Sequence, residues 1–130
     1  MSEQAYTYTK VNTAEISLPA GVTVQVKAKS NSKLTQKVTL KSKDGSVDTV
    51  FSGTGEKNAQ LGETTITTGE SFLLHAVFEF AGDDGVFQPS KLNSGGPYEI
   101  GRYNMLVVVA ENGDDSDYND TILEFSWNTK

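Results

Sequence analysis

The 130-residue chain contains no cysteine, so disulfide bonds cannot contribute to its stability and its redox compartment stays open. It has no run of 18 apolar residues, and insertion into a membrane is therefore not expected. The first residues carry neither a basic start nor an apolar stretch, which argues against a secretory signal peptide. We therefore expect a soluble protein that stays in the cytoplasm or is exported by another route.

Positive charge is scarce relative to negative charge. The chain has 11 lysine and arginine residues against 17 aspartate and glutamate residues, and its formal net charge is -6. No basic patch dense enough to bind nucleic acid is present. Hydrophobic residues make up 36% of the chain, which is ordinary for a globular protein of this length. These totals predict a single domain over residues 1–130 that does not bind nucleic acid.

Helical periodicity is also absent, because no stretch carries a sustained apolar stripe. Instead, Val22, Val24, Val26 and Ala28 alternate with polar residues, as in a strand with one solvent-facing side. Further strand candidates, separated by turn clusters such as residues 53–55 and 82–85, are residues 14–18, 35–41, 48–52, 64–68, 72–80, 98–110 and 121–127.

Many short strands at this spacing predict an all-β fold, an antiparallel β-sandwich of about nine strands with Greek-key-like connections. Residues 1–12 are expected to form an N-terminal extension that adds an edge strand. Residues 81–97, the least regular part of the chain, are expected to form an inserted surface loop.

The chain is unusually rich in acids at residues 111–120, between two predicted strands. This segment holds five carboxylates and two side-chain amides: Glu111, Asn112, Asp114, Asp115, Asp117, Asn119 and Asp120. Two like charges about 4 Å apart repel by about 4 kcal/mol at an effective surface dielectric, so such crowding calls for a compensating cation.

Oxygen ligands without histidine or cysteine favour calcium over zinc or copper. Four negative charges, those of Glu111, Asp115, Asp117 and Asp120, match two divalent ions. The EF-hand loop is excluded, because counting from Asp115 the sixth position is Asp120 rather than glycine and the twelfth is Ser126 rather than glutamate.

The run Glu111-x-Gly113-x-Asp115-x-Asp117-Tyr118-Asn119-Asp120, followed by a strand ending in Trp127, resembles the C-terminal motif of the soluble bacterial two-calcium lectins, the LecB-type fucose/mannose binders. Shorter matches occur in the same order at residues 16–20, 30–32, 35–36, 51–53 and 58–59. The resemblance covers residues 14–80 and 103–130.

The resemblance implies a non-enzymatic lectin with two calcium ions per chain. The implied ligands of the first ion are Glu111, Asp115, Asp117 and Asp120. Those of the second ion are Asp117, Asn119, Asp120 and the backbone carbonyl of Asn31, together with the C-terminal carboxylate of Lys130 from a partner subunit. A homodimer or tetramer is accordingly expected.

The resemblance also implies how a sugar binds. The two ions would coordinate vicinal hydroxyls of fucose- or mannose-type glycans. Ser32, Lys33 and Leu34 occupy the positions that tune the monosaccharide preference, and Asn112 stands where a side chain accepts a sugar hydroxyl.

Two other function classes stay open at this point. A glycoside hydrolase would use two of the acids, one of them with a raised pKa in an apolar pocket, although such crowding favours metal capture. A structural calcium-binding β-module would use the ions only to stiffen a loop. Product formation identifies the hydrolase, and sugar affinity that follows calcium separates the lectin from the structural module.

Overall fold

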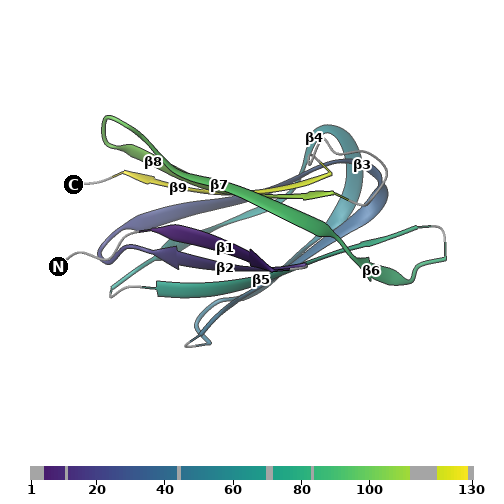
Figure 1. Ribbon diagram of the computed structural model, residues 1–130, viewed down its shortest axis with the longest axis horizontal. Coiled ribbons are helices and arrows are strands. Elements are labelled where there is room, and N and C mark those ends of the chain that lie inside the picture. The colour runs from purple at the N-terminus through teal and green to yellow at the C-terminus, as the bar shows by residue number, and fades with distance from the viewer. Residues whose placement is uncertain are drawn as a thin grey trace.

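The computed structural model is an antiparallel β-structure in which one sheet bends over into two layers (Figure 1). It describes residues 5–10, 12–43, 45–69, 72–82, 84–111 and 120–128, without the side chain of residue 58. No helix that could cross a membrane occurs in these ranges. The strands are β1 (Tyr6–Lys10), β2 (Thr13–Leu18), β3 (Thr23–Ser42), β4 (Asp48–Thr67), β5 (Phe72–Ala81), β6 (Phe87–Pro89), β7 (Lys91–Ile100), β8 (Tyr103–Glu111) and β9 (Thr121–Asn128).

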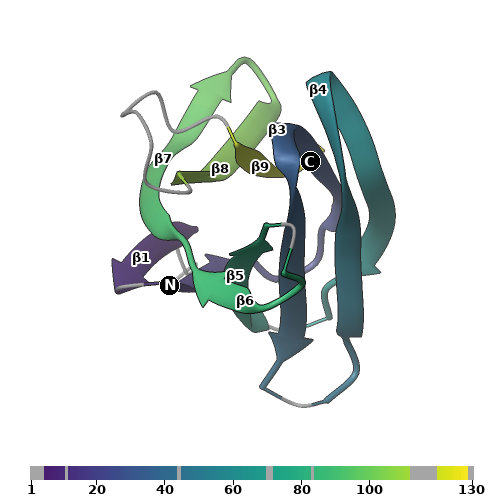
Figure 2. The same cartoon turned by 90° about the vertical axis from the view of Figure 1, so that its right-hand side faces the viewer.

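The 20-residue strand β3 organises the fold, because it belongs to both layers. Its residues 23–30 pair with the second half of β4, and residues 25–30 pair also with β9. Its residues 35–42 pair with β5, while most of them pair also with the first half of β4. The sheet order is β1-β2-β5-β3-β9-β8-β7, and Figure 2 shows the two ends of this order curving toward each other.

The core lies between the two layers and is built from alternating residues on each strand. In β3, for example, Val24, Val26 and Ala28 are fully buried while the residues between them are exposed. The alternation predicted there is therefore confirmed. Burying one large aliphatic or aromatic side chain contributes about 1.5–3 kcal/mol. The largest fully buried apolar side chains are Phe78, Phe125, Ile16, Leu18, Leu40, Leu74, Leu106 and Leu123.

The predicted all-β antiparallel sandwich is confirmed, but the strand boundaries differ at β3 and β4. The sequence divides each of them into two strands, whereas each is continuous and passes from one layer to the other. The turn expected at residues 53–55 lies inside β4. A Cβ atom on Gly55 would lie 2.7 Å from the Cβ of Ala59, so this glycine allows a close approach within a bent strand rather than a chain reversal.

A second difference from the predicted strand boundaries lies in the C-terminal half of the chain. Residues 98–110 were expected to form one strand, but β7 ends at Ile100 and β8 begins at Tyr103. The two residues between them, Gly101 and Arg102, form a tight hairpin connection in which Gly101 has a φ of 60°. Glycine adopts this angle without a Cβ clash. The strand-forming residues on either side of it, Tyr98, Ile100 and Tyr103, made the segment look like one continuous strand in the sequence.

The segment 81–97, expected to be a loop, contains β6 and most of β7. The missed part of β7, residues 91–97, has one aliphatic side chain, Leu92, before the run Gly95-Gly96-Pro97, so it shows no apolar alternation that would reveal a strand. At the other end of the chain, the N-terminal extension contributes β1, which pairs with β2 from Tyr6 opposite Ser17 to Lys10 opposite Thr13.

Candidate functional site: the β3 corner and the acidic hairpin

The chain passes from one layer to the other at residues 30–36 of β3, which we call the β3 corner. Its pairing with β4 shifts register three times between Ala28 and Gln36, so the regular ladder is interrupted there. Side chains bind the backbone instead. The buried hydroxyl of Ser30 donates to the carbonyl of Gly55 at 3.0 Å. These contacts hold the bend against β4.

A single hydroxyl from β4 fixes the middle of the corner. The Oγ1 atom of Thr54 donates to the carbonyl of Ser32 at 3.1 Å and to that of Lys33 at 2.8 Å. The hydroxyl of Ser32, a residue that is 7% exposed, accepts the N–H of Leu34 at 3.1 Å. Lys33 is exposed and Leu34 is half-buried. The three residues predicted to tune sugar preference therefore form one braced segment.

A buried glutamine ties the corner to β9. The side chain of Gln36 is fully buried; its Oε1 accepts the hydroxyl of Thr121 at 2.6 Å and its Nε2 donates to the carbonyl of Leu34 at 3.2 Å. Next to it, the backbone N–H of Asn31 donates to the carbonyl of Asp120 at 3.0 Å. The β3 corner thus lies directly against the start of β9.

The two ends of the acidic segment are neighbours. Ala110 pairs with Thr121 across the β8–β9 hairpin, and the N–H of Asp120 donates to the carbonyl of Ala110 at 3.1 Å. Glu111 is 1% exposed and Asp120 is 8% exposed, so two carboxylate residues are buried where these strands end. Aspartate and glutamate are almost never fully buried unless they are paired or bind a metal. Figure 1 shows this end of the hairpin beside the bends of β3 and β4.

The predicted site residues divide into two groups. Asn31, Glu111 and Asp120 of the predicted metal ligands come together with Ser32, Lys33 and Leu34 at the β3 corner. The remaining ones, which lie outside the described residues, are Asn112, Asp115, Asp117, Asn119 and Lys130. Within the described ranges no three acidic or histidine side chains form a metal-binding group, since these ranges contain only the two ends of the acidic segment.

Sequence reasoning missed the residues that brace the corner. Nothing near Thr54 indicates that β4 will lie against residues 32 and 33. The sequence pointed to Gln36 in one way only, because residues 35–36 are one of the short matches to the LecB-type lectins. Thr121 was seen only as the first residue of a strand.

Replacing Gln36 by leucine is expected to lower the free energy of unfolding by about 1–3 kcal/mol, because the Thr121 hydroxyl and the Leu34 carbonyl each lose a buried partner. Urea denaturation in the presence of a chelator measures this without a metal contribution. The matched control is Gln60→Leu, at an exposed position of β4, with an expected change within about 0.5 kcal/mol. Equal stability of Gln36→Leu and the unaltered protein would show that the hydrogen bonds of Gln36 to Thr121 and Leu34, the Gln36 clamp, do not stabilise the fold.

Comparison with known proteins supplies the class and the family. The sequence model of the family described as fucose-binding lectin II (PA-IIL) matches residues 16–129. The protein is therefore a carbohydrate-binding protein of the lectin class. It belongs to the fucose-binding lectin II family.

Solved structures agree with this assignment. The Ralstonia solanacearum high-affinity mannose-binding lectin is 26% identical, with a TM-score of 0.68 over 89% of this chain and 96% of that one. The Chromobacterium violaceum lectin CV2L, solved with alpha-methyl-fucoside, is 27% identical, with a TM-score of 0.68 over 94% of this chain and 100% of that one. The C-terminal domain of the BC2L-C lectin from Burkholderia cenocepacia, 21% identical over 93% of this chain and 98% of that one, shares the fold with a TM-score of 0.67. No curated protein sequence matches the chain significantly.

Proposed function

We propose that this lectin binds fucose- and mannose-type monosaccharides through two adjacent calcium ions at the β3 corner and the acidic hairpin. The observation that carries the proposal is the hydrogen bond from the N–H of Asn31 to the carbonyl of Asp120, at 3.0 Å. It places the corner, which has three of the proposed sugar-contacting residues, against Asp120 at the end of the acidic segment.

The residues present fit calcium. Glu111 and Asp120 are both buried, and the eight residues between them add three carboxylates and two side-chain amides. Ionised carboxylates are unfavourable in a buried position unless a positive charge or a metal compensates them. Carboxylate, amide and backbone carbonyl oxygens are the ligands that calcium takes in proteins. Both the burial and the donor set therefore support a calcium centre.

The proposed ligands follow the sequence motif. Glu111, Asp115, Asp117 and Asp120 would hold the first ion. The second ion would be held by Asp117, Asn119, Asp120 and the carbonyl of Asn31. When bound, calcium accepts hydroxyl oxygens of a sugar ring as ligands in place of water. The chain's own part is to hold these oxygens close together and to orient the sugar.

Orientation of the sugar is the proposed role of residues 32–34. Because the Thr54 hydroxyl binds the carbonyls of Ser32 and Lys33, this segment has little freedom to rearrange around a ligand. The exposed Lys33 would bring an ammonium donor to the rim of the site. Asn112 would accept a sugar hydroxyl. Fucose and mannose are proposed together because one similar lectin is described as mannose-binding and another was solved with a fucoside.

We propose no catalytic role for the acids. The decisive experiment is titration calorimetry of the full chain with methyl α-fucoside and methyl α-mannoside, once with calcium and once with excess chelator. Binding that requires calcium supports the proposal. Equal affinity in chelator contradicts it, and stabilisation by calcium without sugar binding indicates a structural module. Release of free sugar from the glycosides, followed by NMR, would indicate the hydrolase instead.

The site is proposed to be completed by a second subunit in a homodimer or tetramer, through the C-terminal carboxylate of Lys130. Removing Thr129 and Lys130 is therefore expected to weaken sugar binding by about 2 kcal/mol, or roughly 30-fold, as loss of a charged interfacial group does. The matched control is Lys130→Gly, which keeps a terminal carboxylate at the same position and should keep its affinity. Unchanged affinity of the truncated protein would refute the contact between subunits.

A further inference from the structure

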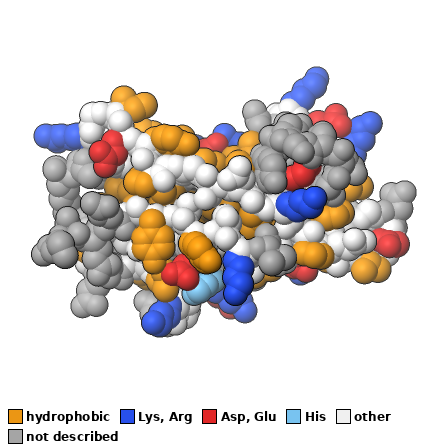
Figure 3. Space-filling view, in the orientation of Figure 1, with side chains coloured by type: hydrophobic (Ala, Val, Ile, Leu, Met, Phe, Trp, Pro, Cys, Tyr) orange, Lys and Arg blue, Asp and Glu red, His pale blue; other side chains and the backbone are white. Residues whose placement is uncertain are grey.

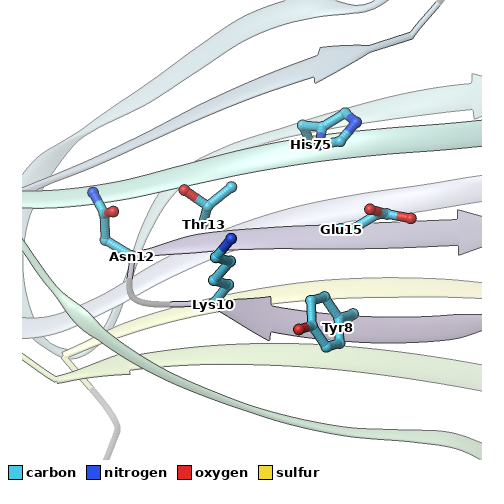
Figure 4. Close-up of a pocket in the computed structure, with 6 residues that line it drawn as sticks. All are labelled: Tyr8, Lys10, Asn12, Thr13, Glu15 and His75. Carbon is cyan, nitrogen blue, oxygen red and sulfur yellow. The ribbon is translucent and has the colours of Figure 1, made fainter.

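A second recess lies on the outer face of the layer formed by β1, β2 and β5, and the lectin site does not use it. Its volume is about 540 Å³, and it is lined by Tyr8, Lys10, Asn12, Thr13, Glu15 and His75 (Figure 4). Figure 3 shows acidic, basic, histidine and hydrophobic side chains gathered on this face, over the same three strands. The recess therefore combines an aromatic ring with several kinds of polar group.

The strand register aligns these side chains. Tyr8 on β1 lies opposite Glu15 on β2, and Glu15 lies opposite His75 on β5. Lys10 lies opposite Thr13 in the neighbouring row. Directly opposed residues have Cβ atoms about 4.5–5.5 Å apart, so the side chains of each row stand next to each other on one face. The recess is thus a consequence of regular pairing and is built on rigid strands.

Most of its polar groups are not used by the fold. The Oε1 atom of Glu15 accepts the hydroxyl of Tyr6 at 3.1 Å, and the Nδ2 of Asn12 donates to the carbonyl of Phe78 at 3.3 Å. The side chains of Lys10, Thr13 and His75 make no hydrogen bond to any residue in the described ranges. Both donors and acceptors therefore remain available to a ligand.

The chemistry of the lining limits the ligand class. The opposite charges of Lys10 and Glu15 offset each other, so the recess has no excess charge with which to favour a phosphate or an amine. A wholly apolar ligand would desolvate the polar groups without replacing their hydrogen bonds. A neutral polyhydroxylated ring has hydroxyls for these groups and a C–H face for the ring of Tyr8, which is 61% exposed. We propose that this recess is a second saccharide-binding subsite that works without metal.

The subsite is independent of the proposed calcium centre. On β5, Ala81 pairs with Thr35 at the β3 corner, whereas His75 lies six residues earlier. At about 3.3 Å per residue, the two sites are separated by about 20 Å along the strand. Binding at the recess can therefore be measured in chelator, where failure of the calcium proposal has no influence on the result.

The test uses the full chain in chelator, with cellotriose as the probe because its β-linked glucose rings present flat C–H faces. His75 is the only histidine of the chain, so its ring resonances in a ¹H–¹³C NMR spectrum report directly on the recess. We expect them to shift saturably, with a dissociation constant of about 1 mM. Tyr8→Ala is expected to weaken binding about tenfold, whereas Tyr8→Phe, which keeps the ring, should retain it.

The matched control is Tyr103→Ala, which removes another exposed tyrosine, on β8, and should leave the affinity unchanged. The proposal is overturned if cellotriose leaves the His75 resonances unmoved. It is also overturned if Tyr8→Ala binds as well as the unaltered protein, or if glycerol at equal hydroxyl concentration causes the same shifts.

Discussion

Replacing Asp120 by asparagine is expected to weaken calcium-dependent sugar binding by about 3 kcal/mol or more, which corresponds to at least roughly 100-fold. The substitution keeps the shape of the side chain and removes the charge from a residue that is 8% exposed. The backbone hydrogen bonds of Asp120 to Asn31 and Ala110 do not involve the side chain, so the corner should keep its form. Titration calorimetry with methyl α-fucoside and equilibrium calcium binding measure the two losses separately.

The matched control for this substitution is Asp48→Asn, at an exposed position at the start of β4, with no expected change. Asp117→Ala should have an effect at least as large as Asp120→Asn, because Asp117 is proposed to contact both ions. An Asp120→Asn protein that binds sugar with full affinity in calcium would rule out this carboxylate as a ligand. If Asp120→Asn lost sugar binding but still bound calcium, Asp120 would orient the sugar without being a calcium ligand.

Removing calcium is expected to lower the melting temperature by about 10 °C. At a calcium concentration 100-fold above the dissociation constant, linkage adds about 2.7 kcal/mol to the stability of the folded state. For a domain of this size, each kcal/mol corresponds to about 3–6 °C. In chelator, buried Glu111 and Asp120, and the three acids between them in the sequence, would also lack a compensating cation. Differential scanning calorimetry with calcium and with chelator, at equal ionic strength, measures the difference.

Two controls distinguish a bound ion from general screening. Magnesium at the same concentration should restore little of the stability, since it demands a tighter octahedral arrangement and loses its water reluctantly. The Asp120→Asn protein should show a much smaller response to calcium than the unaltered protein. Identical melting temperatures with calcium and with chelator would count against the calcium centre.

The alternation of residues 22–28 was enough to predict a half-exposed strand, because period-2 burial is a local property of an extended chain. Local sequence patterns gave the wrong structure at two places: a turn was predicted at residues 53–55, and the turn at Gly101 was missed. A glycine in a bent strand and a glycine in a hairpin turn look alike in sequence, and only the neighbouring strands distinguish them. The first is inside β4, whereas the second separates β7 from β8.

The residues of the candidate site also divide into those that the sequence revealed and those that only the structure revealed. The acids of residues 111–120 are contiguous, so their crowding and their preference for calcium could be inferred directly. Asn31 was found only through the resemblance to the LecB-type lectins. Thr54 and the clamp between Gln36 and Thr121 were not found, because each joins segments that are distant in the chain.

By itself, the sequence determined the strand-rich architecture, the alternating burial of residues 22–28 and the oxygen-rich composition of the acidic segment, since each depends on adjacent or alternating residues. Only the tertiary structure decided that β3 bends between two layers, that its corner meets the start of β9, and that Tyr8, Glu15 and His75 form one row. These are matters of register between strands. Register is set by how the side chains of distant strands pack together and by the turns between them, and no single strand contains that information.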